Sequence, residues 1–248
     1  MSAADSPRRV AVVGAAGGIG RALVQSLAGS GHDVLALDLP ASLDRHPLDV
    51  AAIPIDVLSQ ESIDAAAARL ADTGGQLDGL VNLAGYTRGV MALADTGTEA
   101  FDDTVAGNLR GMFLATRALL PLMAENAAIV MVSSGLAQFI RPGHGAYAAS
   151  KAGVIALAKT FALECAPRIR VNAVAPGPVQ TAFLTGGTGR SDEDQASLVD
   201  PDQFAAAVPM GRIAQPADVV GPIEFLLGPQ SSFMTGQVLW VNGGAYMP

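Results

Sequence analysis

Short apolar runs alternate with helix-like stretches along all 248 residues, and this alternation constrains the fold more than any other feature. The runs are continuous stretches of Val, Ile, Leu and Ala, which is typical of parallel strands covered on both faces. Seven runs predict strands, at 9–13, 33–37, 51–55, 77–83, 127–132, 169–174 and 238–241. Helices are predicted at 18–28, 60–71, 99–123 and 147–164.

Strand–helix alternation with right-handed crossovers predicts a Rossmann-type fold: a doubly wound three-layer α/β sandwich around a seven-stranded parallel sheet. No linker, repeat or charge run divides the chain, so we expect one domain over residues 1–248. Residues 185–208 break the rhythm and are rich in Gly, Ser, Asp and Gln. They predict a substrate-loop insertion that closes as a lid, with a plain surface loop as the alternative.

Composition excludes several classes of partner. The net charge of −8 argues against nucleic acid and against an anionic membrane surface. No run approaches the ~20 apolar residues of a membrane span, and the first residues do not resemble a signal peptide. The single cysteine, Cys165, allows no internal disulfide framework and suits a reducing compartment. A cytoplasmic protein is therefore expected, and no metal site is predicted.

A glycine cluster follows the first predicted strand, in the sequence V-G-A-A-G-G-I-G at 13–20. Gly14, Gly18 and Gly20 have the spacing G-x-x-x-G-x-G, which differs from the standard dinucleotide fingerprint. The physical requirements are similar: a tight turn, backbone close to a pyrophosphate, and a helix N-terminus facing anionic oxygens. The cluster alone also fits a purely structural turn.

Asp38 ends the second predicted strand, 24 residues after Gly14. A carboxylate there can accept both hydroxyls of an adenosine ribose, and it repels a 2′-phosphate. The neighbouring segments 15–18 and 39–41 contain no cation that would receive such a phosphate. The sequence therefore predicts NAD(H) rather than NADP, with a solvated strand end as the alternative reading of Asp38.

Tyr147 and Lys151 lie four residues apart on a predicted helix, and Lys151 is one of two lysines in a chain that has thirteen arginines. Residues i and i+4 share a helix face, so the ammonium can lie beside the phenol and lower its pKa toward a useful value. Such a pair also arises by chance. Ser134 closes the fifth strand at the same sheet edge, where it can hold a substrate oxygen beside the tyrosine.

Five segments together resemble the short-chain dehydrogenase/reductase family over essentially the whole chain. They are V-G-A-A-G-G-I-G, N-L-A-G at 82–85, Ser134 thirteen residues before Y-A-A-S-K, P-G-P-V-Q-T at 176–181, and V-N-G-G near the end. Val13 and Leu83 depart from the pattern, which usually has Thr and Asn there. The resemblance implies a catalytic tetrad of Asn108, Ser134, Tyr147 and Lys151. It implies cofactor contacts from Gly14, Gly18, Ile19, Gly20, Asp38, Asp56, Val57, Asn82, Ala84, Gly85, Tyr147, Lys151, Pro176, Gly177, Val179 and Thr181.

The resemblance implies reversible oxidation of a secondary alcohol to a ketone. Tyr147 would exchange the hydroxyl proton, Ser134 would hold the substrate oxygen, and Asn108 with a water would connect Lys151 to solvent. One alternative is a 3-oxoacyl-carrier-protein reductase, although the net charge and Asp38 argue against an acidic carrier and NADPH. Another, from a different class, is a non-catalytic NAD-binding sensor or scaffold, against which the intact tetrad argues.

The substrate is expected to be a small molecule, but the sequence does not identify it. Candidate contacts are Ser134, Leu136, His144, Tyr147 and Arg88, and an inward-facing Arg88 would imply an anionic substrate. The helices at 99–123 and 147–164 are apolar on more than one face, which favours a homo-oligomer. By resemblance a tetramer is expected rather than a dimer, with the tail 240–248 at a second interface.

Overall fold

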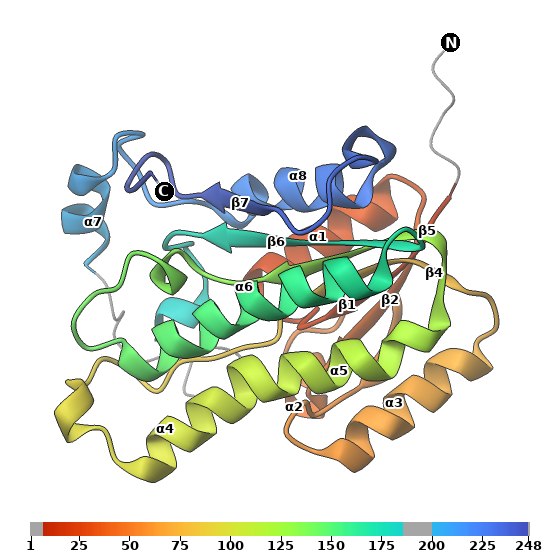
Figure 1. Cartoon of the computed structure of the whole chain (residues 1–248), viewed down its shortest axis with the longest axis horizontal. Helices are drawn as coiled ribbons and strands as arrows, with labels where there is room; N and C mark the ends of the chain where they lie inside the picture. The colour runs from red at the N-terminus through yellow and green to blue at the C-terminus, as the bar shows by residue number, and fades with distance from the viewer. Residues whose placement is uncertain (1–6, 186–199, 248) are drawn as a thin grey trace.

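The computed structural model describes residues 7–185 and 200–247, and in this part of the chain a parallel sheet runs through the middle of the molecule (Figure 1). The strand order is β3-β2-β1-β4-β5-β6-β7, with every neighbouring pair parallel. The seven-stranded sheet of a Rossmann-type sandwich is confirmed. Its strands are β1 (Arg9–Val13), β2 (Asp33–Asp38), β3 (Ala51–Pro54), β4 (Leu77–Asn82), β5 (Met123–Val132), β6 (Ile169–Pro176) and β7 (Val238–Val241).

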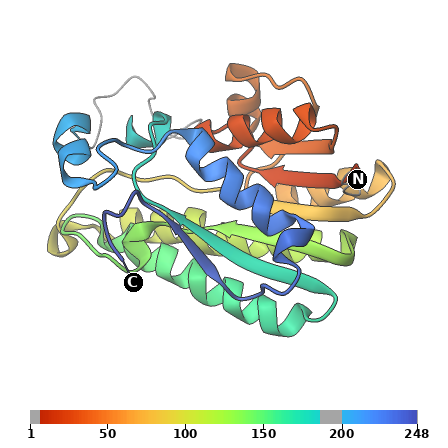
Figure 2. The same cartoon turned by 90° about the horizontal axis from the view of Figure 1, so that it is seen from above.

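Helices cover both faces of the sheet (Figures 1 and 2). Alternate residues of β1 point to opposite faces, so Val13 joins the core beneath α3, α5 and α6 while Val12 joins the core beneath α1 and α8. Continuous apolar strands are thus buried on both sides. The helices are α1 (Gly18–Gly29), α2 (Pro40–Arg45), α3 (Gln60–Asp72), α4 (Thr98–Val105), α5 (Gly111–Leu119), α6 (Gly145–Cys165), α7 (Pro201–Ala207) and α8 (Pro216–Leu227).

The helix predicted at 99–123 was wrong in length and continuity. A π-helical turn at Ala106–Arg110 separates α4 from α5, and Met123 already begins β5. The helix ends at Leu119 because Pro121 lacks an N–H and cannot continue an α-helical hydrogen-bond ladder.

Helix α8 was not predicted. Pro216 occupies its first turn, and the Asp218 carboxylate accepts a hydrogen bond of 2.7 Å from the Gln215 N–H, which are ordinary start signals. An internal Pro222 and a nearly uniform apolar composition obscured its periodicity. Of the predicted insertion at 185–208, residues 186–199 lie outside the described part, and Pro201–Ala207 forms α7.

All seven strands run in the same direction, so their carboxyl ends lie along one edge of the sheet. The chain order reverses between β1 and β4, and ligands of open α/β sheets bind at such a point. None of the described helices is long and apolar enough to cross a membrane.

Candidate functional site

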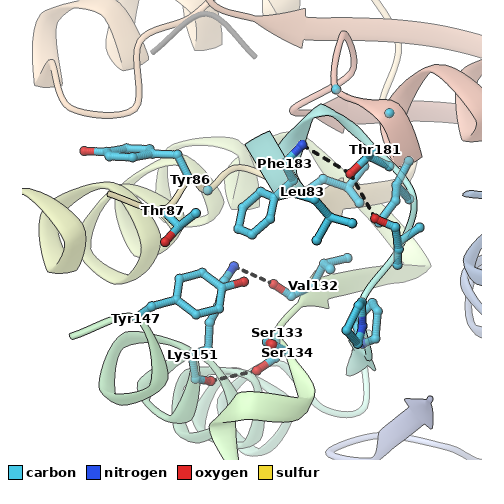
Figure 3. Close-up of a pocket in the computed structure, with 18 of the residues that line it drawn as sticks. Leu83, Tyr86, Thr87, Val132, Ser133, Ser134, Tyr147, Lys151, Thr181 and Phe183 are labelled. Atoms are coloured by element: carbon cyan, nitrogen blue, oxygen red, sulfur yellow. Dashed lines mark hydrogen bonds between the residues drawn. The ribbon is translucent and has the colours of Figure 1, made fainter. Parts of the chain in front are cut away.

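A cavity of about 720 Å³ opens at the carboxyl edge of the sheet, at the point where the strand order reverses (Figure 3). Most of the predicted site residues line it, although they come from six strands, the segments that follow them and helix α6. Those on its wall are Gly14, Gly18, Ile19, Gly20, Asp38, Val57, Ala84, Gly85, Ser134, Leu136, His144, Tyr147, Lys151, Pro176, Gly177, Val179 and Thr181.

The turn between β1 and α1 forms one end of the cavity and requires two of its glycines. Gly14 has φ +85°, which a residue with a side chain rarely adopts. A Cβ on Gly20 would collide with the carbonyl oxygen of Gly14, so only glycine lets α1 begin directly against the turn. The first residues of α1, Gly18, Ile19 and Gly20, lie on the cavity wall, with the Thr181 side chain against Gly18. This cradle fits the pyrophosphate of a dinucleotide.

Asp38 lies beside this cradle at the end of β2 and lines the cavity. Its carboxylate accepts hydrogen bonds from the N–H groups of Ala16 at 2.8 Å and Leu39 at 2.7 Å. Burial raises the pKa of Asp38, and these backbone hydrogen bonds partly offset the effect. The Arg21 guanidinium, the cation nearest in sequence to the turn, donates to the Ala16 carbonyl at 2.6 Å and lies off the cavity wall. The cavity therefore presents a carboxylate where the ribose of a dinucleotide would lie.

Tyr147, Lys151 and Ser134 meet on the opposite side of the cavity. Tyr147 and Lys151 lie one turn apart near the start of α6, with the Lys151 Nζ 5.8 Å from the centre of the phenol ring. Ser134 lies on the same wall, near enough to the Tyr147 phenol to favour its ionised form. The Lys151 Nζ donates to the Val132 carbonyl at 3.0 Å, and the Ser133 hydroxyl donates to the Lys151 carbonyl at 2.7 Å (Figure 3). These contacts fix the start of α6 against the end of β5.

The electrostatics differ from the sequence-based expectation for Tyr147. Within the protein itself, burial raises the pKa of the phenol, and the neighbouring Ser134 side chain only partly opposes this rise. Burial also lowers the pKa of Lys151 to about 7, so at neutral pH the lysine is close to half neutral and attracts a phenolate weakly. The sequence predicted that Lys151 would lower the pKa of Tyr147, but the contacts within the protein raise it.

Asn108 lies in the π-helical turn and is fully buried behind the cavity wall. Its amide group donates to the carbonyls of Tyr86 at 2.7 Å and Thr104 at 2.9 Å, and its oxygen accepts from the Tyr86 N–H at 3.1 Å. A Cβ on Gly85 would lie 2.5 Å from the Asn108 oxygen and 3.1 Å from the Lys151 Nζ. Gly85 therefore leaves room for both the Asn108 oxygen and the Lys151 Nζ. The π-helical turn that carries Asn108 is a feature often found at functional sites.

Two predicted cofactor residues lie off the cavity wall. The buried Asn82 amide donates to the Met112 carbonyl at 3.2 Å and the Thr116 hydroxyl at 3.1 Å. Its oxygen accepts from the Ala84 N–H at 3.3 Å, so it holds the turn that does line the cavity. Asp56 accepts from the Leu58 N–H at 2.9 Å in the turn before α3. Asn82 and Asp56 therefore hold neighbouring backbone in place, and neither of them lines the cavity.

The two departures from the family pattern have a structural account. Val13 belongs to the core under α3, α5 and α6, and Leu83 packs against the core on the other face. The Leu83 N–H donates to the Val13 carbonyl at 2.8 Å. The ends of β1 and β4 are therefore joined through the backbone and through packing, without polar side chains.

Arg88 does not line the cavity, in contrast to the other candidate substrate contacts. Its side chain is 59% exposed and forms an ion pair of 2.7 Å with Asp103. A guanidinium on the wall belongs instead to Arg141, and Tyr246 lies there too. The sequence analysis did not name Arg141, and it expected the tail that contains Tyr246 to lie at a subunit interface. The position of Tyr246 shortly after β7, at the same sheet edge, is the signal that could have identified it.

The buried Lys151 makes stability depend on pH. Its pKa is lowered to about 7 by burial, so between about pH 7 and its ordinary 10.5 the unfolded chain binds the proton more strongly than the folded chain. The contribution of Lys151 to the free energy of unfolding therefore rises with pH across that window. We expect Lys151→Met to remove this slope, which is on the order of 1 kcal/mol per pH unit. Urea unfolding of both proteins at several pH values measures it.

Lys159 provides the matched control because it is the other lysine, lies on α6 and is exposed. Lys159→Met should leave the pH dependence of the free energy of unfolding as in the unchanged protein. Equal slopes for all three proteins would show that Lys151 is not buried as described.

Comparisons with known proteins agree with this geometry. A family model described as enoyl-(acyl carrier protein) reductase matches residues 14–246. An uncharacterized short-chain type dehydrogenase/reductase, y4vI, of Sinorhizobium fredii is 39% identical over 96% of this chain, which spans 44% of that protein. The 3-oxoacyl-[acyl-carrier-protein] reductase FabG of Thermotoga maritima is 36% identical over 94% of this chain and 95% of its own length.

A solved structure shares the fold. The 3-ketoacyl-(acyl-carrier-protein) reductase of Brucella melitensis, complexed with NADH, superposes with a TM-score of 0.86 at 30% identity, covering 97% of this chain and 98% of the other. The family model, the relatives matched over nearly all of this chain and the shared fold lead to one conclusion: this chain belongs to the short-chain dehydrogenase/reductase family and is an NAD(P)-dependent oxidoreductase of that type.

Proposed function

We propose that this protein interconverts a secondary alcohol and a ketone with NAD(H) as the cofactor. One observation carries the proposal: the Ser134 and Tyr147 side chains lie in the same cavity as the glycine cradle and Asp38. Proton-transfer groups and a dinucleotide cradle in a single cavity are the arrangement that hydride transfer to or from a carbonyl carbon requires.

A nicotinamide dinucleotide held by the glycine cradle and Asp38 would, when bound, supply or accept the hydride. Tyr147 exchanges the proton of the substrate oxygen as general acid or base. Ser134 hydrogen-bonds that oxygen and stabilises charge that develops on it. Lys151, in its protonated form, makes the neighbourhood of the phenol positive and can donate to a sugar hydroxyl. Asn108 fixes the backbone beside Lys151, where the resemblance implies a water path to solvent.

NAD rather than NADP is proposed because of Asp38. Its carboxylate lies on the cavity wall and can accept ribose hydroxyls, whereas a 2′-phosphate would be repelled. The guanidinium of Arg21 is held at the Ala16 carbonyl. The relative from Brucella melitensis, itself complexed with NADH, is consistent with this cofactor.

A 3-oxoacyl-carrier-protein reductase remains the second candidate because two of the relatives above carry that name. The net charge of −8 disfavours docking of an acidic carrier. A non-catalytic NAD-binding sensor is the third, and the presence of Ser134, Tyr147 and Lys151 together on the cavity wall argues against it.

A substrate panel separates these candidates. NADH and NADPH fluorescence would be followed with small ketones, with secondary alcohols and with a 3-oxoacyl thioester. Turnover of ketones with NADH above NADPH supports the proposal. Preference for the thioester with NADPH would favour the reductase, and no turnover with tight NADH binding would favour the sensor.

We also propose a homo-oligomer, a tetramer rather than a dimer. Apolar side chains are exposed on the outer surface, including Leu163 on α6 at 83% and Phe233 before β7. Exposed apolar surface of this kind marks protein contacts. The molar mass in solution, measured by light scattering, tests it: four chain masses support the tetramer, and a single chain mass refutes any oligomer.

A further inference from the structure

We propose that the substrate of this enzyme carries a carboxylate, held in the cavity by the Arg141 guanidinium and the Tyr246 hydroxyl. The inference rests on the proposed function and names the class of substrate at the same site. It assigns to Arg141 the recognition that the sequence suggested for Arg88.

Arg141 lies in the loop between β5 and α6 and lines the cavity. Its guanidinium lies 5.5 Å from the centre of the Phe204 ring on α7, and within the described part of the chain no carboxylate pairs with it. Guanidinium groups bind carboxylates through two parallel hydrogen bonds and keep their charge at all relevant pH values. Arg141 is therefore an exposed cation on the cavity wall that is available to a ligand.

Tyr246 supplies a hydroxyl without a partner. Its oxygen is buried and makes no hydrogen bond to any described residue, which is rare for a buried polar atom. The ring stacks on Phe139 at 4.2 Å, so its direction is fixed. A Cβ on Gly135, next to Ser134, would collide with the Tyr246 hydroxyl, so glycine admits the oxygen there. Burial raises the pKa of Tyr246 to about 12, which keeps the phenol a hydrogen-bond donor.

The charges around Arg141 and Tyr246 suit an anion close to the reacting carbon. Arg141 is near enough to act electrostatically on Tyr246 and on His144, and Tyr246 on Tyr147. Burial and Arg141 lower the pKa of His144, so at neutral pH its neutral ring can donate one N–H. Asp200, also on the wall, is exposed and accepts from the Asp202 N–H at 3.0 Å. A substrate carboxylate would thus lie between Arg141 and Tyr246, near the carbon that Tyr147 serves.

The first test compares acids with their amides. Oxo acids of graded chain length and acetylbenzoates would be reduced with NADH, each beside its own primary amide, which keeps the shape and removes the charge. We expect kcat/KM for the best acid to exceed that of its amide by roughly 10- to 100-fold, as for hydrogen bonds to charged groups. Arg141→Gln should lower this ratio of acid to amide most of the way to one. The kcat/KM for the amide should stay within about threefold of its value in the unchanged protein.

Arg88→Gln is the matched control, since it removes an equal charge from an exposed side chain off the cavity wall. The ratio of acid to amide should not change in this variant. Tyr246→Phe should lower the ratio by a smaller factor than Arg141→Gln, because it removes one neutral donor and leaves the cation in place.

A second readout needs no turnover. Trp240 is the only tryptophan, and its ring lies 6.4 Å from Tyr246 and 6.1 Å from Phe139, so its fluorescence reports on this part of the cavity. Benzoate and benzamide would be titrated in the presence of NAD. Benzoate should bind more tightly than benzamide, and Arg141→Gln should abolish the difference.

The two readouts separate failure of this proposal from failure of the proposed function. Selective benzoate binding without reduction of any ketone would support the carboxylate site and refute the alcohol–ketone reaction. Ketone reduction with equal rates for acids and amides, or a ratio that changes with Arg88→Gln instead of Arg141→Gln, would overturn the carboxylate site alone.

Discussion

Tyr147→Phe is expected to lower kcat by on the order of 10²- to 10⁴-fold, the range that a positioned acid or base contributes. The phenol lies on the cavity wall with Ser134, and Phe keeps the ring, whose centre is 5.7 Å from that of Phe183, while removing the hydroxyl. NADH affinity should therefore stay within about threefold. Single-turnover kinetics and NADH fluorescence titration measure the two quantities separately.

Tyr86→Phe is a fitting control because it also removes one hydroxyl from a tyrosine of the cavity wall. The Tyr86 hydroxyl donates to the Asp103 carbonyl at 2.9 Å, away from Tyr147 (Figure 3). Its loss should reduce kcat by less than about tenfold. Unchanged turnover in Tyr147→Phe would refute the general acid–base role.

Asp38→Ser is expected to shift the preference between the two dinucleotides by on the order of 100-fold in the ratio of kcat/KM values. The change removes charged acceptors of the ribose hydroxyls and, at the same time, the repulsion of a 2′-phosphate. NAD use should fall and NADP use should rise. Initial rates with both cofactors give the ratio directly.

Asp44→Ser makes the same change in net charge on the nearby helix α2, at an exposed residue off the cavity wall. The cofactor ratio should not move in that variant. If Asp38→Ser left the ratio unaltered, or if the unchanged enzyme already favoured NADP, the assignment of Asp38 to the ribose would be wrong.

Local patterns explain which parts of the site could be predicted. The spacing of Tyr147 and Lys151 places both on one helix face, and the glycines after β1 satisfy steric needs within a single turn. Both features depend on neighbours within a few residues. The carboxyl ends of parallel strands then bring Ser134 to the same edge of the sheet whatever the loops do.

The features of the site that could not be predicted depend on contacts between segments far apart in the sequence. Arg88 and Arg141 both follow a strand end in sequence, but Asp103 holds Arg88 outside the cavity, and no local pattern encodes that pairing. Tyr246 reaches the cavity because Gly135, more than a hundred residues earlier, leaves room for its hydroxyl. The pKa of Tyr147 likewise follows from burial by distant segments, which spacing alone does not reveal.

The strand order makes cofactor choice and substrate choice separately adjustable. Asp38 ends β2, and Arg141 lies in the loop after β5; the ends of these two strands are three strand spacings apart, or roughly 14 Å. Side chains so far apart with no common partner usually have additive effects. An enzyme altered at both positions should thus show the product of the two single changes, so new cofactor and substrate preferences can be selected one after the other without mutual interference.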